Sequence, residues 1–437
     1  MDDTLEVPLE KRLGKRYVTL VKQHQHSCSS SAVGPSLGAC GGSALAAVQA
    51  QWRFLNNDRV SLAALVEPLL RQGTAALAAE GDSAPGLLVH DWSKVVHAHG
   101  EDTVVLTHAK DVGYELATAL LVSGRDGSPL APMQMYLKSA SGQMVGTGRH
   151  AVARDMAHIE QVLLTMRASR GWSLPGRLVH VIDREADSAD HYRQWDDAGE
   201  WFLVRADDRR VQWKGESMLI SQIDRQMQES GQLRDAREVI YQGQARRQWV
   251  GETTVALYRP GKHRVDGRQV EVPGRVLTLR LVIAQVRDKA GRVLARWWLL
   301  SNVPSEQASG ETIALWYYWR WRIESYFKLL KSGGQQIEAW QQETSMAMAR
   351  RLLVASMACV LAWKLERDAS PDGQQMALLL VRLSGRQMKR TRPVTASALL
   401  AGLFVLLPML ALLEEYNNDP TELIRLAKAT LPYFASG

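Results

Sequence analysis

The spacing of apolar residues changes abruptly near Gly86, and this change limits the possible fold more than any other feature. Residues 1 to about 75 carry helical periodicity, whereas the strand-like runs GLLVHDW, TVVLTHA, ELATALLVS and PMQMYLKS begin at Gly86. A helical pattern at about Ala151 to Arg170 follows, then the strand RLVHVID, a helix after Asp190 and the strand WFLVRAD. Successive strands followed by alternating helices and strands predict an α/β core with helices packed on a mixed sheet.

Two further regions interrupt or follow this core. Between about Asp207 and Trp298, β-like runs separated by the turn signals GKHRVDGR and DKAGR predict a β-rich insertion. From Gly310 the pattern is helical to the end of the chain. We therefore predict three regions: a helical unit at 1–75, an α/β domain at 76–345 with the insertion at about 207–298, and a helical C-terminal region at 346–437.

The balance of charged residues favours a polyanionic partner. The net charge is +7, from 53 Lys+Arg against 46 Asp+Glu. One basic run, RLSGRQMKRTRP at Arg382 to Pro393, could lie against phosphates or form a solvated loop. The three cysteines are too few and too scattered for a disulfide framework, which indicates a reducing cytoplasm.

One uncharged run, Ala396 to Leu413, just reaches the length of a membrane span. Pro408 lies inside it and the rest of the chain offers no second candidate, so a buried or dimer-forming helix is favoured over a span. The first residues, MDDTLEVPLEKRLGKRY, lack the apolar core of a secretory signal. We therefore expect a cytoplasmic protein without a membrane segment.

The segment YYWRWRIESYFKLLK sorts its side chains into two stripes if it forms a helix. One stripe is apolar and would face a core: Trp316, Trp319, Ile323, Phe327 and Leu330. The other combines one acid with a tyrosine and three cations: Tyr317, Arg320, Glu324, Lys328 and Lys331. This second stripe is either a solvated face of i,i+4 pairs or a site where the carboxylate holds Mg²⁺ and the cations grip phosphates.

Two aspartates at strand ends can supply the further carboxylates that a magnesium site needs. Asp91 ends the apolar run LLVHD, and Asp183 ends LVHVID. Acids at strand ends project from the sheet edge where open α/β sheets place their sites, although each one alone is more often a turn or helix-cap residue. Asp91, Asp183 and Glu324 are the candidate catalytic and metal-binding residues.

Two signatures resemble those of the bacterial transposases of the insertion sequence 4 family. They are DREAD at Asp183 to Asp187 and Y-x-x-R-x-x-x-E-x-x-x-x-x-x-K at Tyr317 to Lys331. In the N-terminal region, LEKRLGKRYVTLVKQ and AQWRFLNNDRVS resemble the family's transposon-end-binding domain. The resemblance covers most of residues 8 to 345.

The resemblance implies a ribonuclease-H-like fold in which Asp91 lies on the first strand, Asp183 follows the fourth, and Glu324 lies on a helix after the insertion. It implies a DNA transposase that uses two Mg²⁺ ions, which Mn²⁺ can replace, for cut-and-paste transposition by strand cleavage, hairpin formation and strand transfer. The implied partners are double-stranded DNA, as terminal inverted repeats and target, and a second copy of the chain in a synaptic complex. The resemblance also implies that the protein acts at the bacterial nucleoid.

The resemblance also adds DNA-contacting candidates to Tyr317, Arg320, Lys328 and Lys331. Arg205 matches a family arginine that contacts DNA, and its alternative is a surface salt bridge. The pair Trp297–Trp298 corresponds to one family tryptophan implicated in receiving a flipped base, with core packing as the alternative for either ring.

Three other functions compete with a transposase. A nuclease of the same fold would keep the acids but would need no end-specific N-terminal domain. A non-catalytic DNA-binding protein derived from a transposase would be expected to have lost an acid, and all three are present. An acid/base hydrolase such as a glycosidase would leave the cationic stripe unexplained.

Overall fold

The computed structural model describes residues 3–26, 44–81, 84–108, 111–140, 144–146, 157–265, 268–386, 394–415, 419–421 and 424–425. The basic run at 382–393 is therefore described only as far as residue 386, and the helix predicted at 151–170 only from residue 157.

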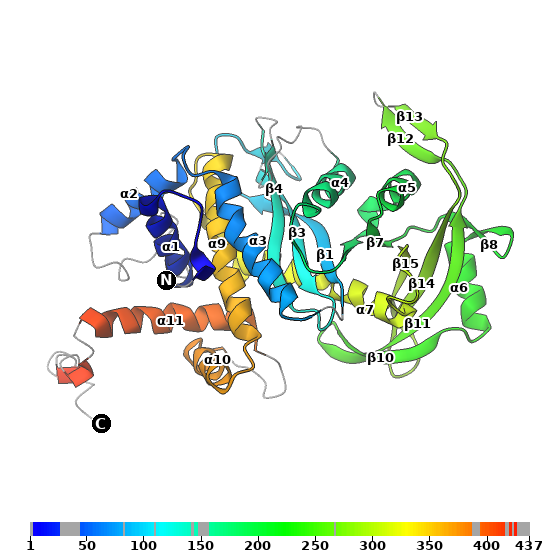
Figure 1. Cartoon of the computed structure of the whole chain (residues 1–437). Coiled ribbons are helices and arrows are strands. Elements are labelled where there is room, and N and C mark those ends of the chain that lie inside the picture. The colour runs from blue at the N-terminus through cyan, green and yellow to red at the C-terminus, as the bar shows by residue number, and fades with distance from the viewer. Residues whose placement is uncertain are drawn as a thin grey trace.

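Five strands form the centre of the sheet, in the spatial order β4-β3-β1-β6-β7 (Figure 1). Their bounds are β1 (Gly86–Val96), β3 (Val112–Ser123), β4 (Pro129–Lys138), β6 (Leu178–Ile182) and β7 (Trp201–Arg205). Strand β3 runs antiparallel to β1 and β4, whereas β6 runs parallel to both β1 and β7. This is the predicted mixed α/β arrangement, and it is consistent with a ribonuclease-H-like transposase core.

The run TVVLTHA was predicted as a full strand, and that prediction was wrong. Only β2 (Val104–Val105) pairs with β3 there. The reason is a lack of anything to bury the run, because Val105 is 63% exposed at this edge. A second short strand, β5 (Met144–Gly146), pairs with β4.

The β-rich insertion continues the same sheet instead of forming a separate layer. Ser301 pairs with Leu203, so the last strand of the insertion lies beside β7 and the two parts share one 13-stranded sheet. The elements are β8 (Arg210–Trp213), β9 (Glu216–Leu219), α6 (Ile220–Glu229), β10 (Arg234–Tyr241), β11 (Gln244–Leu257), β14 (Leu277–Arg287) and β15 (Val293–Ser301). Strands β12 (Gly261–Val265) and β13 (Arg268–Val272) form a separate hairpin. Helix α6 was not predicted, and the predicted end at residue 298 falls inside β15.

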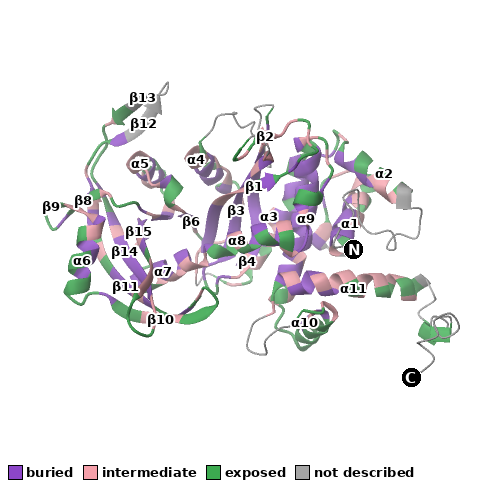
Figure 2. Cartoon of the chain, turned by 180° about the vertical axis from the view of Figure 1, so that it is seen from behind, coloured by how far each residue is buried: buried purple, intermediate pink, exposed green. Residues whose placement is uncertain are grey.

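Helices cover both faces of the sheet, which is why β3, β4 and β6 are almost continuously apolar (Figure 2). On one face lie α4 (His158–Ser169) and α5 (Ala189–Asp197), whose Val162, Met166 and Trp195 join the core beneath them. On the other face lie α3 (Leu62–Ala78), α7 (Gly310–Trp319), α8 (Trp321–Lys328) and α9 (Ser345–Glu366).

The N-terminal helices pack against α9. They are α1 (Lys11–His26), α2 (Ala44–Leu55) and α3, preceded by the short helix η1 (Asp3–Leu5). Arg350 of α9 donates to the carbonyl oxygens of Leu55 at 2.7 Å and Val60 at 2.8 Å. The described helices of residues 1–75 thus share a core with α9, and α3 continues past residue 75 to Ala78.

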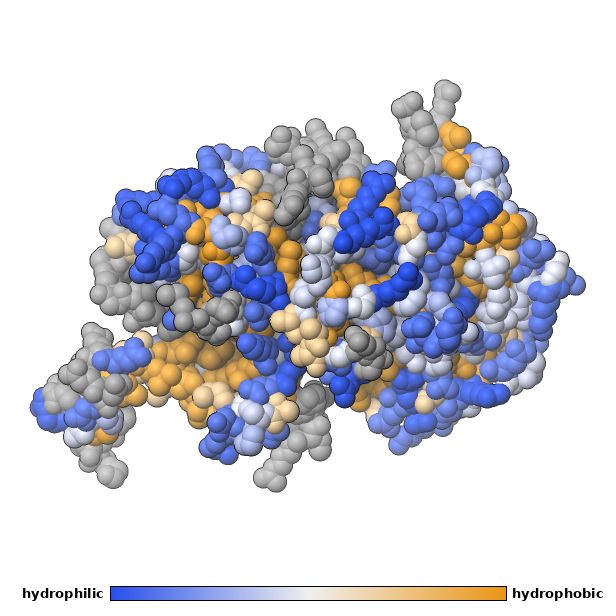
Figure 3. All heavy atoms as spheres, in the orientation of Figure 1, coloured by the Kyte–Doolittle hydropathy of each residue, from blue (hydrophilic) through white to orange (hydrophobic). Residues whose placement is uncertain are grey.

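Two described helices are long and apolar enough to cross a membrane by length and composition alone. In α9, 89% of the apolar window is buried inside the molecule, as in a core helix. The prediction that the chain has no second candidate besides the run Ala396 to Leu413 was therefore wrong. Helix α11 (Ala396–Glu415) follows α10 (Pro371–Leu383), and only 28% of its apolar window is buried. Figure 3 shows the resulting apolar surface along α11.

Candidate active site

Asp91 and Asp183 lie on neighbouring parallel strands at the centre of the sheet. His90 of β1 pairs with Ile182 of β6, so each aspartate comes one residue after this pair. Asp183 leaves β6 and caps the short helix η2 (Arg184–Ala186). Because side chains alternate along a strand, both aspartates face away from α4 and α5, where Ile182 is buried, and toward α8.

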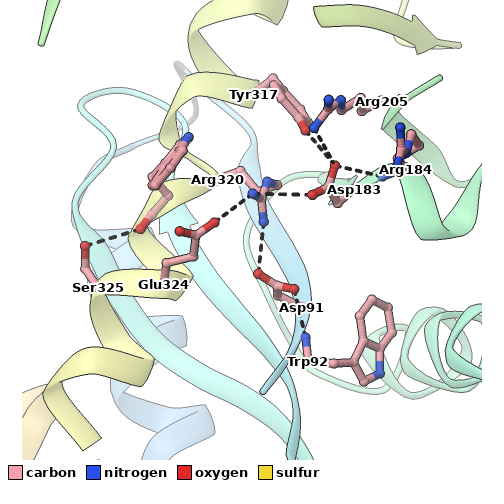
Figure 4. Close-up of polar contacts among 10 residues, drawn as sticks. Asp91, Trp92, Asp183, Arg184, Arg205, Tyr317, Arg320, Glu324 and Ser325 are labelled. Carbon is pink, nitrogen blue, oxygen red and sulfur yellow. Dashed lines mark hydrogen bonds and ion pairs between the residues drawn. The ribbon is translucent and has the colours of Figure 1, made fainter. Parts of the chain in front are cut away.

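Arg320, between α7 and α8, brings the three candidate acids together (Figure 4). Its Nη1 donates to Asp91 Oδ2 at 2.9 Å, and its Nη2 donates to Glu324 Oε1 at 2.8 Å. The same Nη2 lies 3.5 Å from Asp183 Oδ2. The Arg320 side chain is only 8% exposed, whereas that of Glu324 is 39% exposed. Acids from three distant segments therefore meet around one buried cation at a site open on the side of Glu324.

Arg320 lies between α7 and α8 and keeps helical backbone torsions, with φ −49° and ψ −31°. The predicted continuous helix over 317–331 is wrong: α7 ends at Trp319, and the N–H of Arg320 donates to the Tyr317 carbonyl in a tighter i→i−3 bond. A π-helical turn, η3 (Leu329–Gly333), follows α8. The predicted apolar stripe is nevertheless buried at Trp316, Ile323, Phe327 and Leu330.

Two more side chains surround Asp183. Tyr317 Oη donates to Asp183 Oδ1 at 2.9 Å, from a ring that is almost fully buried. Arg205 Nη1 lies 3.6 Å from the same oxygen. Arg205 thus forms a salt bridge, the alternative considered for it, but its partner is a candidate catalytic acid.

The surroundings give the two aspartates opposite pKa shifts. Burial raises the pKa of Asp91, and the attraction of Arg320 only partly opposes it. Burial acts in the same direction on Asp183, but Arg320, the Arg184 N–H and Tyr317 together hold its pKa below the ordinary value. Burial disfavours the charge of Arg320, but Tyr317 and the acids outweigh it and raise the pKa. Asp183 and Arg320 are therefore charged at neutral pH.

The two predicted lysines lie further along the same segment and bond elsewhere. Lys331 Nζ donates to the Lys94 carbonyl oxygen and lies 3.5 Å from Glu338 Oε1. Lys328 is exposed on α8. Within the described contacts, Arg320 alone among the stripe's cations touches the acids.

Trp297 and Trp298 face opposite sides of β15. The ring of Trp297 lies 6.1 Å from that of Tyr317, on the side of the acids. The Trp298 Nε1–H donates to Asp224 Oδ2 at 2.9 Å, beneath α6. Only Trp297 is therefore adjacent to the candidate site.

Two residues at the site were not predicted from the sequence. The backbone N–H of Trp92 donates to Asp91 Oδ1 at 2.9 Å, and that of Arg184 donates to Asp183 Oδ1 at 2.8 Å. The available signal was their position directly after a strand-end aspartate, where a short polar side chain commonly accepts from nearby backbone.

The donor set of the site suits a hard divalent cation. All three candidate ligands are carboxylates, the groups that hold Mg²⁺ in proteins. Among the residues that the structure describes, no three His, Cys, Asp or Glu side chains are placed to hold an ion as they stand. The residues fit a magnesium centre in their chemistry, while the guanidinium of Arg320 contacts all three acids.

Comparisons with known proteins identify one family. The family model of the transposase DDE domain matches residues 141–361, just over half of the chain, and this range includes Asp183 and Glu324. A cryo-EM structure of the piggyBac transposase synaptic complex with hairpin DNA is similar at 11% sequence identity and a TM-score of 0.35, over 94% of this chain and 72% of that chain. No curated protein sequence matches the chain.

Proposed function

The chain belongs to the family of the transposase DDE domain, and on that premise we propose that it cuts and joins DNA at a site built from Asp91, Asp183 and Glu324. The observation that carries this proposal is the meeting of the three carboxylates on Arg320. In the described ion pairs, Arg320 and Arg205 are the only cations that oppose these three negative charges. An excess of negative charge at a partly open site favours divalent cations.

The proposed ligands are Asp91, Asp183 and Glu324, for two Mg²⁺ ions that Mn²⁺ can replace. Such ions supply a more acidic attacking water and stabilise the leaving oxygen. Tyr317 and Arg205 keep Asp183 ionised and oriented, because a carboxylate that accepts hydrogen bonds prefers its charged form. Arg320, once released from the acids, is long enough to contact a phosphate beside them.

The finer assignment is cut-and-paste transposition of an insertion sequence, with hairpin formation, in the insertion sequence 4 family. The DREAD and Y-R-E-K signatures support that family. Lys328 and Lys331 would contact phosphates further from the acids. Trp297 is the better candidate for a flipped base because its ring lies beside Tyr317.

The N-terminal helices offer a surface for the ends of the element. A groove between α1 and α2 contains a single acid, Glu10, among six cations: Lys11, Arg12, Lys15, Arg16, Arg53 and Arg59. Such a concentration of cations suits contact with the phosphate backbone of duplex DNA. We assign end binding to this groove.

A homodimer is the proposed assembly, since two ends must be held together. Helix α11 supplies an exposed apolar surface formed by Val405, Met409, Leu410 and Leu412. A second copy packed on this surface would bury it without a membrane, and the protein would act in the cytoplasm at the nucleoid.

The direct test is incubation of the protein with Mg²⁺ and a supercoiled plasmid, with analysis of joined and nicked products. Joined products support the transposase. Nicks alone would favour the nuclease, and hydrolysis of glycosides that survives EDTA would favour the acid/base hydrolase. DNA binding without any strand breakage would favour a non-catalytic derivative.

A further inference from the structure

His158, the first residue of α4, links the segments that carry Asp91 and Asp183. Its Nδ1 lies 2.7 Å from Glu185 Oε2, and its Nε2 lies 3.0 Å from Glu115 Oε1. The ring also stacks on Trp92, with 4.4 Å between ring centroids and 10° between planes. One side chain of α4 therefore contacts β3, η2 and β1.

The geometry favours the charged form of the ring. Ionised carboxylates only accept hydrogen bonds, so two carboxylate partners require an N–H on both ring nitrogens, which is the imidazolium form. Burial favours the neutral ring, but Glu115 and Glu185 outweigh it and raise the pKa of His158. The contact with His158 lowers the pKa of Glu115 in turn.

The residues that His158 holds are those that orient the two aspartates. Trp92 donates its N–H to Asp91, and its indole Nε1–H also donates to Gln161 of α4 at 2.8 Å. Glu185 lies in η2, next to Arg184, whose N–H donates to Asp183. A shift of α4 would therefore move both backbone donors.

We infer that protonated His158 is a positioning residue that sets the placement of Asp91 relative to Asp183. The contacts alone support the structural part of this inference. Its effect on catalysis rests on the proposed function. The described charged groups that face the ring are Glu115 of β3 and Glu185 of η2. Lys94 of β1 and Lys138 of β4 act on Glu115 and favour its charged form.

Loss of the ring proton removes one of the two ionic hydrogen bonds. A neutral imidazole keeps a single N–H, so it can serve Glu115 or Glu185 but not both. The hydrogen bond to Glu185 of η2 or the one to Glu115 of β3 is then lost. As the pH rises, the distance between Asp91 and Asp183 is no longer fixed.

The first experiment follows the imidazole carbon and proton resonances of the full-length protein by NMR against pH, with His158→Gln for assignment. We expect His158 to titrate above an ordinary histidine, and Glu185→Gln or Glu115→Gln to lower its pKa. Glu160→Gln is the matched control, because Glu160 lies in the same turn of α4 but accepts from the Ala157 N–H. If the pKa of His158 is not raised, or if Glu160→Gln lowers it as much as Glu185→Gln does, the inference about His158 is wrong.

The second experiment measures DNA cleavage and Mn²⁺ affinity in His158→Gln and in Glu185→Gln, whose exposed carboxylate makes misfolding a lesser concern. We expect roughly 10-fold lower kcat and weaker Mn²⁺ binding, with KM for DNA changed less than about twofold. The alkaline decline of the wild-type rate should be absent in His158→Gln. Wild-type rate and pH profile in both variants would refute positioning, whereas a wild type that never cleaves would refute the proposed function and leave the NMR test standing.

Discussion

Arg320 Nη1 donates to Asp91 Oδ2 across 229 positions of the chain, at 2.9 Å. The same guanidinium donates to Glu324, so it screens the repulsion between carboxylates that would otherwise push each other apart. It also takes up oxygens that a divalent ion would need. Arg320 is thus both the internal counter-ion of the acids and a competitor of their proposed metal ions.

Arg320→Met should therefore bind Mn²⁺ more tightly than the wild type, by about tenfold or about 1.4 kcal/mol, in calorimetric titration. In EDTA its Tm should fall, because the acids lose their counter-ion. Lys328→Met is the matched control: it removes one positive charge from the same segment, away from the acids, and should change both values little. Equal effects of the two substitutions would mean that net charge, not contact, governs metal affinity.

Asp91→Asn, Asp183→Asn and Glu324→Gln should each lower Mg²⁺-dependent cleavage by about 100-fold or more, since each removes a charged ligand while keeping its shape. DNA binding in a gel-shift assay should persist, because the basic groove between α1 and α2 is untouched. A variant that still cleaves at the wild-type rate would exclude its residue from the site.

Substitutions of Trp297 and of Trp298 should have different effects. Trp297→Ala should lower the cleavage rate and weaken the fluorescence response of 2-aminopurine placed near the cut, because its ring lies beside Tyr317. Trp298→Ala should mainly lower Tm, since it leaves the buried Asp224 without its indole donor. The reverse pattern would assign the base to Trp298.

Glu366 makes the stability of the C-terminal region depend on pH. Partial desolvation raises its pKa to about 7, with Arg322 and Arg367 opposing, although the residue as a whole is exposed. An acid whose folded pKa is raised stabilises the fold below its unfolded pKa, and this contribution is lost as the pH rises to about 7. In denaturant unfolding, Glu366→Gln should therefore gain stability relative to the wild type between pH 5 and pH 8, by a small amount because Glu366 is exposed to solvent. A stability of the variant that falls relative to the wild type over this range would contradict this.

The local patterns that could be predicted are those set by apolar spacing. Strands β1, β3, β4, β6 and β7 were visible because they are buried on both faces, and Glu324 stood out on a stripe beside a tryptophan-rich core face. Helix α6 was not predicted because it has few apolar residues. The strand predicted for TVVLTHA was too long, because apolar spacing alone does not show whether other residues cover the run.

Tertiary contacts set the features that the sequence could not predict. Nothing in the spacing indicates that Arg320 turns toward Asp91, or that His158 joins Glu115 to Glu185 across separate elements. From the sequence, Asp91 is a single acid at a strand end, and such acids are more often turn or helix-cap residues. In the structure its contact with Arg320 makes it part of the same group as Glu324.

The residues of the site lie far apart in the sequence, so the order of synthesis determines when the site can form. Asp91 and Asp183 emerge from the ribosome long before Arg320 and Glu324, and α1 must wait for α9 before it can pack. A chain still attached at the β-rich insertion holds two acids without the cation and the third acid that complete the group. An enzyme that breaks DNA would thus be held inactive until nearly all of its α/β domain has been made.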